Sequence, residues 1–227
     1  MMNQYVRNIA RLLRDIRHLP TTLYFNFHYF PFKIAIRLPV MVSANVRLLR
    51  TQGRVELSSP ITHRMIRIGF GSVGIFDRNG SKSIWEVTGT VQFKGRADIG
   101  HGSKICVLDG HLSLGNNFKI TAESQIVCNK SIEFGDDCLL SWQVLVMDTD
   151  FHKVYDTDGR RLNEDRSIRI GKKNWIGCRA MVLKGVTTPD NCVVAAGSTV
   201  TRSVKTGDAI LAGSSAEVIR LGIHWQP

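Results

Sequence analysis

One stretch near the middle of the chain combines the side chains that proton-transfer chemistry requires. Residues 146–161 read VMDTDFHKVYDTDGRR, so His152 follows Asp148 and Asp150 at alternate positions. A neutral imidazole accepts a proton near pH 7, and a carboxylate can orient its ring through the second nitrogen. Alternate residues of an extended segment share a face, so the three side chains are predicted to project together. The stretch is a candidate general-base site, with a metal ligand and an ordinary surface-loop histidine as the alternatives.

The remaining histidines and the cysteines do not favour a metal site. His101 and His111 lie far before His152, outside any compact ligand motif. The five cysteines include no C-x-x-C pair, so neither a thiolate zinc site nor a disulfide framework is predicted. We expect buried thiols in a reducing compartment, and no metal.

The residues on either side of this stretch repeat with a period of six. Apolar residues recur at every sixth position, commonly followed by glycine or another small residue. The series contains Val87, Phe93, Ile99, Ile105, Leu114, Ile120, Ile126, Ile132, Phe134, Leu140, Val146, Ile170, Ile176, Val182, Thr188, Val194 and Val200, with short offsets at corners. This period predicts short strands separated by turns, three units to a coil, stacked as a solenoid with the apolar side chains inside. His152 occupies the slot after Val146, where a polar loop with a D-G turn signal begins.

The repeat also carries a family resemblance. Its segments include IGHGSK, LGNNFKITAES, FGDDCLLS, IGKKNWIGCRAMVLKGV and VVAAGSTVTRSV. With these segments, the chain resembles the left-handed parallel β-helix (hexapeptide-repeat) acyltransferases, most strongly over residues 85–220. It looks closest to the O-acetyltransferases of galactosides, maltose and bacterial polysaccharides. The resemblance implies an all-β solenoid. We expect an N-terminal basic segment over 1–60, a β-helix domain over 61–220 with a protruding loop at about 152–167, and a tail over 221–227.

The resemblance also implies a function and a set of site residues. Acetyl-CoA would donate the acyl group, and His152 would deprotonate a sugar hydroxyl. Asp148 and Asp150 would orient the imidazole or bind the sugar, and Trp175 would border the acceptor and pantetheine channel. The CoA site would use Gly177, Cys178, Ala195, Ala196, Gly197 and Thr201 as its groove and Arg220, Arg202, Lys184 and Lys205 near the phosphates. Each of these cations has a solvated surface role as its alternative.

The resemblance leaves several alternatives open. It implies a homotrimer with sites between subunits. The first hypothesis is a sugar hydroxyl as the acceptor group, with the amine of an amino sugar as the alternative. Nucleotidyltransferases and γ-class carbonic anhydrases share the helix, and a non-catalytic scaffold is a further alternative. The galactoside enzymes have glycine before the histidine and proline after it, whereas this chain has Phe151 and Lys153. We therefore expect a different acceptor geometry.

The positive charge is concentrated at the N-terminus. Residues 1–54 contain eight arginines, one lysine and one acid, which accounts for most of the net charge of +11. A basic amphipathic helix is predicted up to Pro20, followed by an aromatic run over 21–32. Two alternatives remain open for residues 1–50: contact with a membrane surface, or packing of the apolar side against the main domain with solvated arginines. No nucleic-acid motif is present. The lack of a secretory signal or a long apolar stretch predicts a cytoplasmic protein, with peripheral contact at the inner membrane face.

Overall fold

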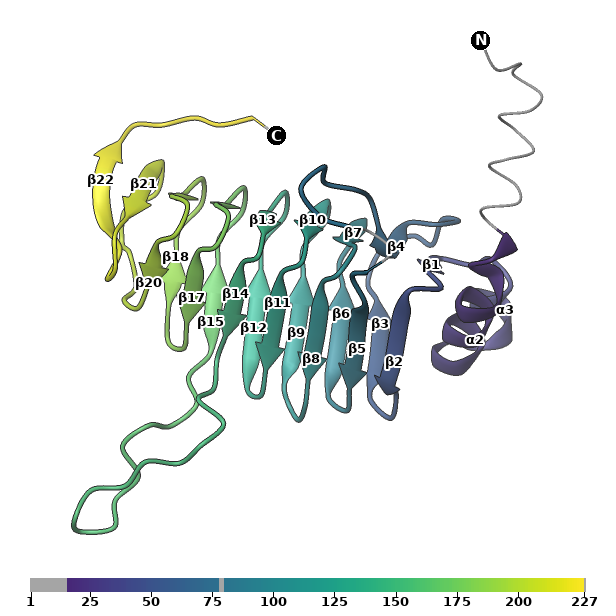
Figure 1. Cartoon of the computed structure of the whole chain (residues 1–227), viewed down its shortest axis with the longest axis horizontal. Helices are drawn as coiled ribbons and strands as arrows, with labels where there is room; N and C mark the ends of the chain where they lie inside the picture. The colour runs from purple at the N-terminus through teal and green to yellow at the C-terminus, as the bar shows by residue number, and fades with distance from the viewer. Residues whose placement is uncertain (1–15, 78–79, 227) are drawn as a thin grey trace.

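In the computed structural model, which describes residues 16–77 and 80–226, the chain winds into a three-sided coil (Figure 1). From β1 to β18, each turn of the coil contributes one strand to each of three sheets, named A, B and C in the order in which the chain visits them. Sheet A contains β1 (Val40–Val42), β4 (Ile66–Phe70), β7 (Ala97–Gly100), β10 (Phe118–Ala122), β13 (Leu139–Trp142), β16 (Trp175–Ile176), β19 (Val193–Val194), β21 (Ala209–Ala212) and β22 (Glu217–Leu221). Sheet B contains β2 (Val46–Arg50), β5 (Ser83–Val87), β8 (Lys104–Val107), β11 (Gln125–Cys128), β14 (Leu145–Met147), β17 (Met181–Leu183) and β20 (Thr199–Val200). Sheet C contains β3 (Arg54–Leu57), β6 (Thr90–Phe93), β9 (His111–Leu114), β12 (Ser131–Phe134), β15 (Ile168–Ile170) and β18 (Thr187–Thr188).

The strands pair in parallel within each sheet, apart from the antiparallel pair β21–β22. The architecture is the predicted parallel β-helix.

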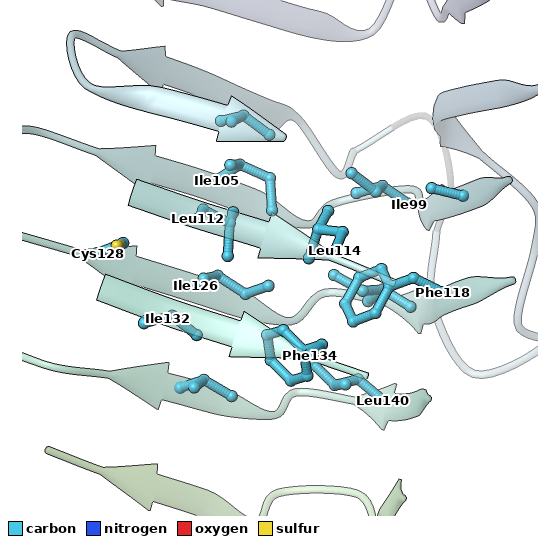
Figure 2. Packing of buried hydrophobic residues seen from close by; sticks show 14 of the residues in the cluster. Ile99, Ile105, Leu112, Leu114, Phe118, Ile126, Cys128, Ile132, Phe134 and Leu140 are labelled. Carbon is cyan, nitrogen blue, oxygen red and sulfur yellow. The ribbon is translucent and has the colours of Figure 1, made fainter. Parts of the chain in front are cut away.

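The period of six corresponds to the inward positions of this coil. Every member of the series is 3 % exposed or less. Equivalent residues stack in register from coil to coil, as Ile105, Ile126 and Val146 do along sheet B. Figure 2 shows such rows in the interior. The rings of Phe118 in sheet A and Phe134 in sheet C also contact each other across the interior, with centroids 4.9 Å apart. Burial of each such side chain stabilises the fold by roughly 1.5–3 kcal/mol, so the stacked rows form the core.

The coil begins earlier than the boundary predicted at residue 61. Strands β1, β2 and β3 already pair with β4, β5 and β6, one in each sheet. The β-helix therefore starts at Val40. The amphipathic helix predicted near the N-terminus falls largely on residues 1–15, which lie outside the described residues.

Two helices cover the first coil: α2 (Leu19–Tyr29) and α3 (Phe32–Ala35). Asn26 accepts a hydrogen bond from the N–H of Val40 (3.2 Å) and donates one to its carbonyl (2.7 Å). Thr22 bonds both backbone groups of Val42 in the same way. These side chains satisfy the free edge of β1, which would otherwise present unpaired backbone groups. The inner face of α2 thus packs against the main domain, which was one of the two alternatives for this region.

Across residues 16–77 and 80–226, no helix combines the length and apolar character needed to span a bilayer.

Candidate active site

The loop that carries His152 leaves the coil at the corner between sheets B and C. It connects β14 to β15, and Figure 1 shows it projecting far beyond the turns of neighbouring coils. His152 is exposed at its start, and its N–H donates to the carbonyl of Asp150 at 2.6 Å. Phe151 has a φ of 59°, in the left-handed region that favours glycine. The position before His152 thus has a backbone that suits glycine, although this chain has phenylalanine there.

Asn163 fastens the two arms of the loop together. Its amide group donates to the His152 carbonyl at 2.7 Å and to the Asp150 carboxylate at 2.9 Å. Its side-chain oxygen accepts the N–H of Val154 at 2.7 Å. Farther out, Tyr155 and Arg161 form an antiparallel bridge. Asn163 therefore fixes the backbone that holds the imidazole, a role that the sequence analysis did not predict because no local motif marks this residue.

Asp150 lies at the root of the loop and is paired. Its carboxylate forms an ion pair with Lys184, which also donates to the Asn163 carbonyl at 3.2 Å. The hydrogen bond from Lys184, followed by that from Asn163, holds the pKa of Asp150 below its ordinary value. Lys184 was predicted near the CoA phosphates, but its largely buried ammonium is engaged by Asp150 instead.

Asp148 does not share a face with His152. Its side chain is fully buried and accepts the backbone N–H groups of Asn129 (2.7 Å), Lys130 (3.0 Å) and Ser131 (2.7 Å). The extended-segment prediction is wrong here because the chain turns between Asp148 and His152. Asp148 instead anchors the loop to the preceding coil. Burial, followed by the negative charge of Asp148, raises the pKa of the adjacent Cys128 thiol.

The small residues predicted to line a CoA groove gather at another corner, between sheets A and B. Gly177 and Cys178 lie one coil before Ala195 and Ala196, and the N–H of Gly197 donates to the Cys178 carbonyl at 2.8 Å. A Cβ on Gly177 would stand 2.7 Å from the Ala196 nitrogen, so the coils can approach this closely only with glycine. Cys178 is partly exposed and Ala196 is exposed. The corner is open to a ligand that runs along it.

Trp175 and Arg220 both lie in sheet A, on β16 and β22. They line an open pocket of about 390 Å³ together with His224 and Trp225. The two indoles lie 5.8 Å apart, and Trp175 donates its ring N–H to Ser141 at 3.0 Å. The tail after residue 220 thus folds onto the sheet through Trp225. His224 and Trp225 were not predicted as site residues, because the tail carries no repeat.

Thr201 and Arg202 follow β20 and lie at the corner between sheets B and C, the one from which the loop departs. Thr201 shares a hydrogen bond with Ser215. The predicted residues therefore divide among three places: the B–C corner, the A–B corner and the face of sheet A. The described part of the chain contains no group of three His, Cys, Asp or Glu side chains suited to a metal ion.

Sequence comparisons relate about half of the chain to known proteins. No family model matches the chain. The galactoside O-acetyltransferase of Escherichia coli is 33% identical over 112 residues, which are 48% of this chain and 54% of that protein. The bifunctional protein GlmU of Clostridium acetobutylicum is 29% identical over 110 residues, 48% of this chain and 21% of that protein. The chain thus spans about half, or less, of the length of the curated relatives it matches.

Among solved structures, the polySia-specific acetyltransferase NeuO aligns with a TM-score of 0.50 and 20% identity, covering 83% of this chain and 79% of that one. This likeness concerns the fold, which is the left-handed parallel β-helix that the family resemblance implied. The sequence match over about half of the chain adds that its hexapeptide repeats are similar to those of a sugar O-acetyltransferase. The predicted resemblance to the hexapeptide-repeat acyltransferases is confirmed.

Proposed function

We propose that the protein is an acetyl-CoA-dependent O-acetyltransferase that modifies a sugar hydroxyl in bacterial surface polysaccharide biosynthesis. One observation carries the proposal: an exposed histidine stands at the root of the long loop of a hexapeptide-repeat coil, on a backbone fixed by Asn163. The 33% identity to a galactoside O-acetyltransferase supports the reaction class.

In the proposed reaction, the imidazole of His152 removes the proton of the acceptor hydroxyl as its oxygen attacks the thioester carbonyl. The C–S bond breaks, and the imidazolium returns the proton to the departing CoA thiolate. General-base assistance of this kind contributes about 10²–10⁴ to the rate. Asn163 acts as a positioning residue, since it bonds the His152 carbonyl and not the ring.

We propose a homotrimer in which each site lies between two copies. His152 stands at the B–C corner, whereas Cys178 and Ala196 lie at the A–B corner and Trp175 on sheet A. In a ring of three-sided coils, one corner of each copy can face another side of its neighbour. CoA would then occupy the A–B corner of one copy while the histidine of the next copy faces the thioester. Arg220 and Arg202 are the proposed phosphate contacts.

We place the enzyme in the cytoplasm, at the inner face of the cell membrane, where lipid-linked saccharide acceptors would be within reach. The basic N-terminal segment supports this location, because anionic lipid surfaces attract clustered arginines.

The test compares the parent protein with His152→Ala, using acetyl-CoA and a panel of hydroxyl and amino sugars. The variant is expected to bind CoA with unchanged affinity. Its rate of acetyl transfer should fall about 10²–10⁴-fold. Full activity in His152→Ala would exclude the mechanism. No CoA binding by the parent would favour a scaffold, and acetylation of amino sugars alone would make the protein an N-acetyltransferase.

A further inference from the structure

Large apolar side chains remain exposed on the two helices that cover the first coil. We define the helix patch as Leu19, Leu23, Tyr24, Phe27, Phe32 and Ile36, which are 38–69% exposed. Phe25 and Ala35, on the opposite sides of the same helices, are fully buried. Exposed apolar groups that gather in this way are typical of an interaction surface. The helices stand at one end of the solenoid, away from the loop of His152 (Figure 1).

A basic pocket lies on sheet A near the same end. It has a volume of about 360 Å³, and its charged lining consists of Arg64, Arg67, Arg96, Lys119 and one carboxylate, Asp98. Arg67 forms an ion pair with Asp98 at 3.3 Å, and Lys119 lies in register with Asp98 on the next strand. Arg96 and Lys119 are exposed, and no hydrogen bond or ion pair of their side chains is found among the described residues. A surplus of cations around one hollow fits a phosphate group.

The helix patch and the basic pocket adjoin each other. His63 and Arg64 line the pocket and also a smaller depression that Leu19 of the patch borders. The segment holding them is tied to the end of α3, because the Arg37 guanidinium donates to the Ile61 carbonyl (2.7 Å) and the Arg37 carbonyl contacts a His63 ring nitrogen (3.1 Å). An apolar surface beside a phosphate-sized basic hollow matches the boundary between acyl chains and headgroups.

We propose that the helix patch and the basic pocket form one membrane-docking surface for anionic phospholipids. The lipid phosphate occupies the pocket beside Arg96 and Lys119, while the patch enters the acyl boundary. No acidic residue occurs between Asp15 and Glu56, so nothing in this part of the sequence repels an anionic bilayer. The aliphatic members of the patch favour acyl chains over a polyanionic glycan as the partner. The proposal rests on the membrane location proposed above and is independent of acetyl transfer.

The test measures sedimentation of the full chain with phosphatidylcholine vesicles, with and without phosphatidylglycerol. The pocket variant is Arg96→Gln with Lys119→Gln, and the patch variant is Phe32→Ser with Ile36→Ser. The control, Lys153→Gln with Arg160→Gln, removes the same charge from the loop between β14 and β15, at the B–C corner. All six substituted positions are exposed, and thermal melting verifies that each variant folds.

The parent is expected to prefer vesicles that contain phosphatidylglycerol. The pocket variant should lose roughly five-fold in affinity per cation removed. The patch variant should lose binding to both vesicle types, and the control should bind like the parent. The proposal would be overturned if the parent bound both vesicle types with equal affinity. It would also be overturned if the pocket variant and the control bound the vesicles with equal affinity. A third contrary outcome is a pocket variant that binds lipid like the parent but is retained more weakly on immobilised heparin. That outcome would assign the pocket to a polyanionic glycan.

Acetyl transfer to a soluble acceptor, measured on the same proteins, separates the two proposals. Lipid binding that follows the expected order without any transfer would support docking and count against the enzyme. Transfer without lipid binding by the parent would overturn docking and leave the enzyme standing.

Discussion

The corner between sheets B and C is built in two ways in successive coils. Between β11 and β12 the chain turns through Asn129 and Lys130, whereas between β14 and β15 it leaves for a loop over residues 148–167. Both corners nevertheless deliver the next strand in register, with Ile132 opposite Ile168.

The short turn supports the long loop directly. Asp148, at the start of the loop, accepts three N–H groups of residues 129–131, and Asn129 donates to Asp165, near the loop's end, at 2.7 Å. The comparison shows that a β-helix can project a loop without disturbing its core when the preceding coil satisfies the polar groups at the loop's root.

Loss of the Asp148 carboxylate should produce the largest change in stability. Asp148→Ala leaves three backbone donors without their acceptor in a buried site, and we expect a loss of about 3 kcal/mol in the free energy of unfolding. Chemical denaturation measures it, with Asp148→Asn as a milder variant if the alanine variant does not fold.

The matched control is Asp156→Ala at the loop tip, where the carboxylate also accepts two backbone N–H groups, from Asp158 and Arg160. The control should lose less than about 1 kcal/mol, because its donors can bond water instead. Equal losses at the two positions would contradict the supporting role of the short turn.

Asn163→Ala should loosen the loop with less effect on the coil. It removes the bonds to the His152 carbonyl, Asp150 and Val154, each contributing about 1 kcal/mol locally. We expect faster proteolysis within the loop and a lower kcat, with the global unfolding midpoint nearly unchanged. Thr157→Ala, at the exposed tip, is the control. Unaltered cleavage and kcat in Asn163→Ala would show that the amide does not position the histidine.

The smallest effect is expected from the ion pair of Asp150 with Lys184. Because the pKa of Asp150 is lower in the folded protein, the pair stabilises the fold above the ordinary carboxyl pKa, and this stabilisation disappears as the pH falls through the lowered value. The carboxylate is partly exposed, so the contribution should stay below about 1 kcal/mol. In Lys184→Met, carbon-detected NMR should give a higher titration midpoint for Asp150. An unchanged midpoint would contradict this assignment.

The period of six predicted the interior because each inward side chain contributes to one continuous core, from Val87 to Val200. The coil between Val40 and Leu57 was missed because insertions and a register shift between β2 and β5 interrupt the period there.

The role of Asp148 could not be predicted from the sequence. Its partners stand 17–19 residues earlier, one coil away, where spacing along the sequence gives no guide. His152 could be proposed as a site residue because it stands where the period is interrupted, whereas Asn163 lies in a loop that has no period.

The most direct test of the shared site is complementation between two inactive variants. His152→Ala lacks the base, and Ala196→Trp fills the proposed groove at the A–B corner; each is expected to be inactive alone. If each site combines two copies in a ring of three, refolding an equal mixture should restore about a quarter of the parent activity. A mixture as inactive as its components, with mixed oligomers demonstrated by mass spectrometry, would contradict a site built between copies.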